Sequence, residues 1–200
     1  MIVARTVLLR LLLGVLPFVS TAAGADRAAQ WLSPGPALPA VTLLDHEGRH
    51  IRLDEVGRER IVIVNFFFPR CATICPMQTA VLRDVRVALA GRAPDEARRP
   101  LILSIAIDPE GSSPADLRRY AGEFDLSLGA REGWLMLSGS LETVKTLQAA
   151  FDESGASPLD HSGNLWIGAP ARRRWTRILN SSPAASAPEA IAALALEAAQ

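Results

Sequence analysis

The sequence predicts an α/β fold with a mostly parallel sheet that helices cover. Residues 61–68 and 101–107 are short, near-continuous apolar runs, as expected for strands that are buried on both faces. Segments with apolar residues at helical spacing separate these runs. Because strands that alternate with helices are typical of parallel sheets, we expect one such domain, and 200 residues suffice for its core.

The composition excludes several other classes of protein. Hydrophobic residues make up 49% of the chain and charged residues 21%, which indicates an ordered globular protein. The 21 basic residues balance the 21 acidic residues, so no excess of positive charge favours nucleic-acid binding. With only two cysteines, the chain is not a small domain stapled by disulfides.

The first 25 residues are expected to form a signal peptide. Arg5 and Arg10 supply positive charge, residues 11–19 are apolar, and residues 23–25 (Ala-Gly-Ala) form a small-residue cleavage site. Because a membrane span needs about 20 apolar residues, we favour cleavage over an uncleaved inner-membrane anchor. Export predicts an oxidising compartment, the bacterial periplasm, in which two close cysteines have a redox or a metal role.

Residues 26–40 are rich in Pro and are expected to form an irregular linker before a domain at 41–200. The expected elements of that domain are a hairpin with strands 41–44 and 50–53, strand 61–68, helix 76–90, strand 101–107, a helix that starts at 113, strand 134–137, helix 140–151, antiparallel strands 164–167 and 174–179, and helix 188–199. This order matches a thioredoxin-like fold with an N-terminal β-hairpin and an extra strand-helix insertion.

Local signals support each of these elements. Residues 45–48 end in Gly and suit a hairpin turn, and the polar segment 91–100 reads as a surface loop. Ser113 is a capping residue before Pro and lies three residues before an Asp, which matches a capping box. Apolar residues recur at helical spacing in two helices, at Val81, Val85 and Leu89 and at Leu141, Val144, Leu147 and Phe151. Three tryptophans are expected in or beside the core: Trp134, Trp166 and Trp175.

Both cysteines lie between the first central strand and the first long helix. Functional groups gather at the carboxyl ends of strands in such sheets. Cys75 lies at the helix N-terminus, where backbone N–H groups favour a thiolate, and Arg70 adds positive charge next to Cys71. A purely structural disulfide would close a very short loop and stabilise little. The C-x-x-x-C spacing therefore favours a redox or a metal-binding role.

A metal role needs a third donor, because two thiolates leave a soft monovalent ion under-ligated, and Cu(I) accepts such donor sets. His161 lies just before strand 164–167. In a thioredoxin-like sheet, the loop before that strand passes beside the cysteine loop, which makes His161 the candidate. His46 and His50 flank the hairpin turn and are expected to be exposed.

The chain contains VNFFFPRCATICP, then SIAIDPEGSSPADLRRYAGEF, then WLMLSGSLETVKTLQAAF and then DHSGNLWIG. In this order, the CxxxCP motif, the DP segment and the DHS motif resemble the Sco/SenC family of copper chaperones, over roughly residues 36–180. The resemblance implies a thioredoxin-like fold and a Cys-Cys-His copper site made by Cys71, Cys75 and His161. Asp160 matches the Asp before that His and would either hold the loop or be solvated.

Two functions are consistent with these residues. The first is a copper-binding chaperone that delivers Cu(I) or Cu(II) to a haem-copper (cytochrome c) oxidase subunit or another periplasmic copper protein. The second is a thiol-disulfide oxidoreductase that uses Cys71 and Cys75 to keep the copper-ligand cysteines of a client reduced. Either would need a thioredoxin-like reductant. We expect a monomer without nucleic-acid partners, and we interpret the run of arginines at 172–174 as a solvated hairpin tip.

Overall fold

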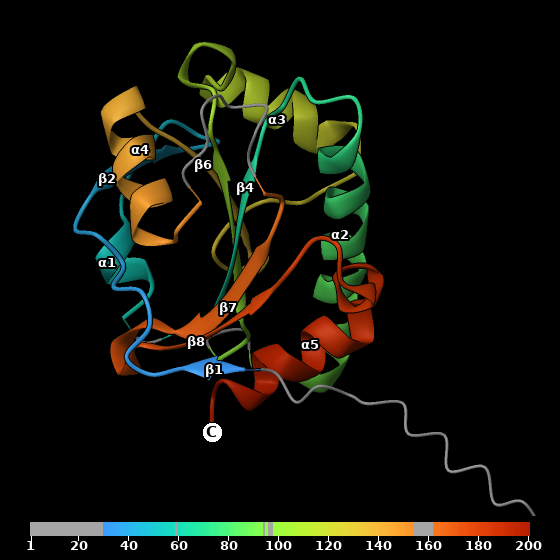
Figure 1. Cartoon of the computed structure of the whole chain (residues 1–200). Helices are drawn as coiled ribbons and strands as arrows, with labels where there is room; N and C mark the ends of the chain where they lie inside the picture. Colours follow the sequence, from blue (N-terminus) through green and yellow to red (C-terminus); the bar gives the residue numbers. More distant parts are fainter. Residues whose placement is uncertain (1–29, 59, 94, 96–97, 154–161) are drawn as a thin grey trace, which may run out of the picture.

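The computed structural model of the chain describes residues 30–200 except 59, 94, 96–97 and 154–161. Its centre is an eight-stranded mixed sheet with the strand order β1-β8-β7-β4-β5-β6-β2-β3. Helices cover both faces, with α2 and α5 on one side and α1 and α4 on the other (Figure 1). The expected α/β, thioredoxin-like architecture is confirmed.

The strands are β1 (Trp31–Leu32), β2 (Thr42–Asp45), β3 (His50–Arg52), β4 (Val62–Phe67), β5 (Leu101–Ala106), β6 (Trp134–Ser138), β7 (Leu165–Ala169) and β8 (Arg174–Ile178). The α-helices are α1 (Leu53–Val56), α2 (Ile74–Arg92), α3 (Pro114–Gly122), α4 (Leu141–Ala150) and α5 (Pro188–Glu197). Three 3-10 turns complete the described elements: η1 (Pro109–Gly111), η3 (Pro170–Arg172) and η4 (Pro183–Ser186).

The three central strands β4, β5 and β6 run parallel, as the apolar runs predict. The hairpin β2–β3 extends the sheet beyond β6 through antiparallel pairing. On the other side, β7 pairs antiparallel with both β4 and β8. The antiparallel pairing of β7 with β4 places the end of β4 and the beginning of β7 at the same edge of the sheet.

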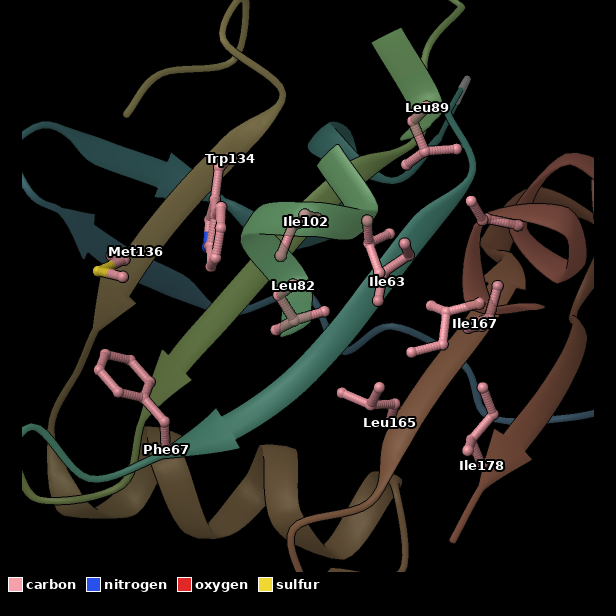
Figure 2. Packing of buried hydrophobic residues seen from close by; sticks show 14 of the residues in the cluster. Ile63, Phe67, Leu82, Leu89, Ile102, Trp134, Met136, Leu165, Ile167 and Ile178 are labelled. Atoms are coloured by element: carbon pink, nitrogen blue, oxygen red, sulfur yellow. The ribbon is translucent and has the colours of Figure 1, made fainter. Parts of the chain in front are cut away.

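The core consists of two apolar clusters, one on each face of the sheet. The first lies under α2, α3 and α5, and Figure 2 shows part of it, with Leu82 of α2 over Ile63 and Ile102 of the neighbouring strands. The second lies under α1 and α4. The three tryptophans expected in or beside the core are all at most 3% exposed: Trp134, Trp166 and Trp175.

Part of the segment that was expected to be irregular forms a strand. Trp31 and Leu32 make β1, which pairs antiparallel with β8 at the edge of the sheet. The indole Nε1–H of Trp31 donates to Glu197 of α5 at 2.8 Å, and the guanidinium of Arg174 lies 3.8 Å from its ring centroid. The partners of this strand are distant in sequence, so local composition does not reveal it.

The prediction that both histidines of the hairpin turn are exposed is wrong for one of them. His50 is exposed, but His46 is only 5% exposed. The backbone carbonyl of His46 accepts a hydrogen bond from Arg118 of α3 at 2.5 Å, and burial lowers the pKa of its imidazole below the ordinary value. Packing of α3 against the turn buries this side chain.

Two glycines differ in the space available to a side chain. A Cβ on Gly168 of β7 would lie closer than 3.0 Å to the indole of Trp175, whereas a Cβ on Gly91 of α2 would meet nothing within 4 Å. We predict that Gly168→Ala lowers the free energy of unfolding by about 1–3 kcal/mol through overpacking. Gly91→Ala should leave it unchanged or raise it by up to about 1 kcal/mol, because alanine favours helix. Equal midpoints of urea unfolding for the two variants would contradict this packing.

Candidate metal centre

The two cysteines lie where the polypeptide passes from β4 into α2. The backbone N–H of Cys71 donates to the carbonyl of Phe68 at 2.9 Å, which closes a tight turn directly after the strand. Thr73 precedes the first helical residue, and Cys75 is the second residue of α2. Both cysteines are free thiols in this structure, and α2 begins two residues earlier than the sequence predicts.

Cys71 is partly exposed, and several hydrogen-bond donors lie around its sulfur. Partial burial opposes ionisation of this thiol. The backbone N–H groups of Cys75 and Thr73, the Thr73 hydroxyl at 3.5 Å and the Cys75 thiol outweigh burial and lower the pKa of Cys71 to about 7. Cys71 is therefore the thiol that ionises near neutral pH.

Cys75 has the opposite character. Its side chain is 2% exposed, and burial raises its pKa to about 12, although the backbone N–H of Phe68 donates to its sulfur at 3.5 Å. The thiol of Cys75 also donates to Cys71, and an ionised Cys71 repels a second negative charge. The sequence-based expectation that the helix N-terminus favours a thiolate at Cys75 is therefore wrong, because burial of this sulfur outweighs the N–H groups that reach it.

Arg70, next to Cys71, forms an ion pair with a carboxylate from another segment of the chain. Its guanidinium lies 2.5 Å from the carboxylate of Asp108, which follows β5, and 5.5 Å from the ring centroid of Phe68. A Cβ on Gly111 would lie closer than 3.0 Å to both members of this ion pair. The pair joins the cysteine loop to the DP segment after β5, and glycine at position 111 makes room for it.

The loop before β7 lies beside the cysteine loop, as the sequence predicts. A Cβ on Gly163 would come within 2.9 Å of Ile74 Cδ1, and the Gly163 carbonyl accepts a hydrogen bond from Gln78 Nε2 at 2.6 Å. Ile74 and Gln78 flank Cys75 on α2. The two other residues singled out in this loop, Asp160 and His161, lie outside the described residues.

The described part of the loop is fixed from its other side by a buried carboxylate. Glu153 is 4% exposed and accepts hydrogen bonds from the Ser162 hydroxyl, from Asn164 Nδ2 at 3.1 Å and from Trp166 Nε1 at 2.8 Å. The amide oxygen of Asn164 in turn accepts from the backbone N–H of Asn180 at 3.1 Å. These contacts give the chain just before β7 a defined path.

Sequence reasoning missed the side chains that support the two loops. Thr73, Gln78 and Glu153 carry no motif of their own. A signal was nevertheless present for Gln78, because a polar residue one turn after Cys75 lies on the helix face that the apolar spacing marks as buried. For Thr73, only the local geometry shows that its hydroxyl reaches Cys71.

The described part of the chain does not by itself complete a metal site. Within it, no three His, Cys, Asp or Glu side chains come together as a group that could hold a metal ion. Cys71 and Cys75 supply two soft donors, and a third has to come from elsewhere. None of the helices in the described ranges is both long enough and apolar enough to span a membrane.

The fold and the loop define a thioredoxin-like protein with a C-x-x-x-C dithiol at the carboxyl end of a central strand. The family model SCO1/SenC matches residues 36–195, so the chain belongs to this family. The SCO1 protein homolog of Bacillus subtilis (strain 168) is 30% identical over 98 residues, which are 49% of this chain and 47% of that protein. The alignment thus spans about half of the curated relative.

Solved structures of the same family share the fold. BsSco, described as a member of the Sco family of cytochrome c oxidase assembly proteins with a disulfide switch, matches with a TM-score of 0.70 at 20% identity, over 86% of this chain and 98% of its own. The copper-bound ScoI of Arabidopsis thaliana matches with a TM-score of 0.63 at 17% identity, over 82% of this chain and 97% of its own.

The two thiols should differ sharply in reactivity. In the reduced, metal-free protein, we predict that iodoacetamide alkylates Cys71 with a midpoint near pH 7, because only the thiolate reacts and its fraction rises with pH. Cys75 should react much more slowly throughout the range from pH 6 to pH 9, since it stays protonated and buried. Mass spectrometry of peptides from a pH series measures both rates.

Thr73→Val provides the control. Valine has nearly the same shape as threonine but lacks the hydroxyl that lies 3.5 Å from the Cys71 sulfur. The alkylation midpoint of Cys71 should therefore move to higher pH. Alkylation of Cys75 before Cys71, or an unchanged midpoint in Thr73→Val, would contradict the account of the site.

Proposed function

We propose that this chain is a copper-binding chaperone that delivers copper to the copper centre of a haem-copper (cytochrome c) oxidase in the bacterial periplasm. The observation that carries the proposal is that the loop before β7 reaches the start of α2, where Gly163 lies against Ile74, the residue just before Cys75. His161 lies two residues before Gly163, so its imidazole is the proposed third ligand. Family membership and the copper bound to a relative support the same reading.

The donor set suits copper as a transferable cargo. Thiolates are soft ligands for Cu(I), and an imidazole helps to accommodate Cu(II). Cys71 ionises readily, whereas Cys75 has to lose its proton when the metal binds, so loading releases protons and strengthens with pH. The partial exposure of Cys71 gives a partner protein access to the ion.

Export forms part of the proposal. Residues 1–25 are proposed to be a signal peptide that is cleaved, and an inner-membrane anchor is the alternative. In either case, the domain would work in an oxidising compartment. The dithiol would then require a thioredoxin-like reductant before copper can bind.

The difference between the two thiols favours a second candidate function, thiol-disulfide exchange. The Cys71 thiolate would attack one sulfur of a client disulfide, form a mixed disulfide and release the other client sulfur as a thiolate. After losing its proton, Cys75 would attack the sulfur of Cys71 and release the reduced client. This step leaves a Cys71–Cys75 disulfide, which an external dithiol must reduce.

Copper titration tests the first function. We predict that the reduced protein binds one copper ion per chain. His161→Ala should weaken Cu(II) binding by about tenfold or more, because the proposed nitrogen ligand is lost. His50→Ala is the matched control, since His50 is exposed on β3, and it should bind copper like the unaltered protein. His46 is unsuitable as a control because it is buried.

Two outcomes would contradict the chaperone. The reduced protein could fail to retain copper during desalting, or His161→Ala and His50→Ala could bind Cu(II) equally well. Copper analysis after desalting measures retention, and competition with a chelator of known affinity compares the two variants. Cu(I) binding by His161→Ala should fall less than Cu(II) binding, because both thiolates remain.

A glutathione redox titration of Cys71–Cys75, paired with copper affinity on the same sample, separates the two functions. A chaperone should bind copper tightly and turn over a client disulfide slowly. A reductase should exchange disulfides quickly. The reduction potential of its Cys71–Cys75 disulfide should lie above roughly −300 mV, because purely structural disulfides have lower potentials. Fast exchange together with weak, easily displaced copper would reject the chaperone and support the reductase.

A further inference from the structure

A chain of buried hydrogen bonds crosses the protein and ends at the loop before β7. The indole Nε1–H of Trp134 donates to Ser104 Oγ at 2.9 Å, and Ser104 Oγ donates to Asn65 Oδ1 at 2.7 Å. Asn65 Nδ2 donates to Gln78 Oε1 at 3.0 Å, and Gln78 Nε2 donates to the carbonyl of Gly163 at 2.6 Å. These hydrogen bonds thus connect β6, β5, β4 and α2 with the loop before β7.

The chemistry of Trp134 sets the direction of this path. An indole can only donate, so it occupies Ser104 Oγ as an acceptor and the hydroxyl proton is directed to Asn65. The amide oxygen of Asn65 then accepts, its nitrogen donates to Gln78, and the Gln78 nitrogen is left for Gly163. All four side chains are at most 7% exposed, so a reversed amide would leave buried polar groups without partners.

Gly163 is a position at which the backbone path matters. Its φ is +64°, in the left-handed region that favours glycine, and a Cβ there would press on Ile74 Cδ1. Glu153 fixes the neighbouring Ser162 and Asn164 from the side of β7. The hydrogen bond from Gln78 joins this backbone to the helix that carries Cys75.

We propose that Gln78 is a positioning residue, which holds the loop before β7 at a fixed place relative to the two cysteines through the Gly163 carbonyl. This inference rests on the proposed copper site and deepens it, because His161 is two residues from Gly163 in the sequence. Gln78 itself donates no ligand. It acts by joining the helix of the thiolates to the backbone that leads to the imidazole.

The test compares Gln78→Leu with Thr79→Val. Leucine fills a similar volume and removes the donor to Gly163. Thr79 is the next residue on α2, is 2% exposed and shares a hydrogen bond of 2.7 Å with the Tyr120 hydroxyl, so its replacement removes a buried hydrogen bond that does not reach the loop. The two variants are thus matched in burial and in the kind of bond lost.

Two readouts decide the result. In the reduced, metal-free protein, hydrogen exchange at the amides of residues 162–164 should speed up about tenfold in Gln78→Leu and change little in Thr79→Val. In the Cu(II) form, the nitrogen hyperfine coupling in the electron paramagnetic resonance spectrum should weaken or split into several species in Gln78→Leu alone. Equal exchange rates in the two variants would overturn the positioning role.

The two readouts also separate this inference from the proposed function. If the unaltered protein binds no copper, the copper function fails, and the exchange rates of the metal-free protein still decide the role of Gln78. If Gln78→Leu does not fold, Gln78→Met replaces it. Methionine is similar to glutamine in length and has no N–H to donate to Gly163, so the same acceleration of exchange is expected.

Discussion

The antiparallel pairing of β4 with β7 is the constraint on which the site depends. Asn65 pairs with Leu165, so β4 ends at the edge of the sheet where β7 begins. The cysteine loop that follows β4 and the loop that precedes β7 therefore meet at one place, although they are far apart in sequence. The parallel strand β5 contributes from its other side, since Asp108 follows it and pairs with Arg70 of the cysteine loop.

Burial and hydrogen bonding give the two thiols different properties at this meeting point. The same helix N-terminus lies beside both cysteines. Its N–H groups outweigh burial at the partly exposed Cys71 but not at the buried Cys75, which keeps its proton. A soft metal ion would draw both into the ionised form, whereas disulfide exchange would use them in turn. The two proposed functions thus use the difference in pKa between Cys71 and Cys75 in different ways.

The sequence predicted the central strands, the covering helices and the location of both cysteines, because long apolar runs and helical spacing are local signals. Other features depend on partners that are distant in sequence. Trp31 and Leu32 form a strand only because β8 offers a free edge, and His46 is buried by packing that involves Arg118. The expectation of a thiolate at Cys75 failed because depth of burial cannot be read from helix position. The role of His161 stays a prediction, since this residue lies outside the described part of the chain.

The proposed copper site brings two sulfurs and one nitrogen to a single ion. X-ray absorption spectroscopy of the reduced protein loaded with one equivalent of Cu(I) measures these ligands. We predict about two Cu–S vectors and one Cu–N vector, with the Cu–N contribution absent in His161→Ala. A spectrum with sulfur from one cysteine only, or with the same nitrogen contribution in His161→Ala, would contradict it.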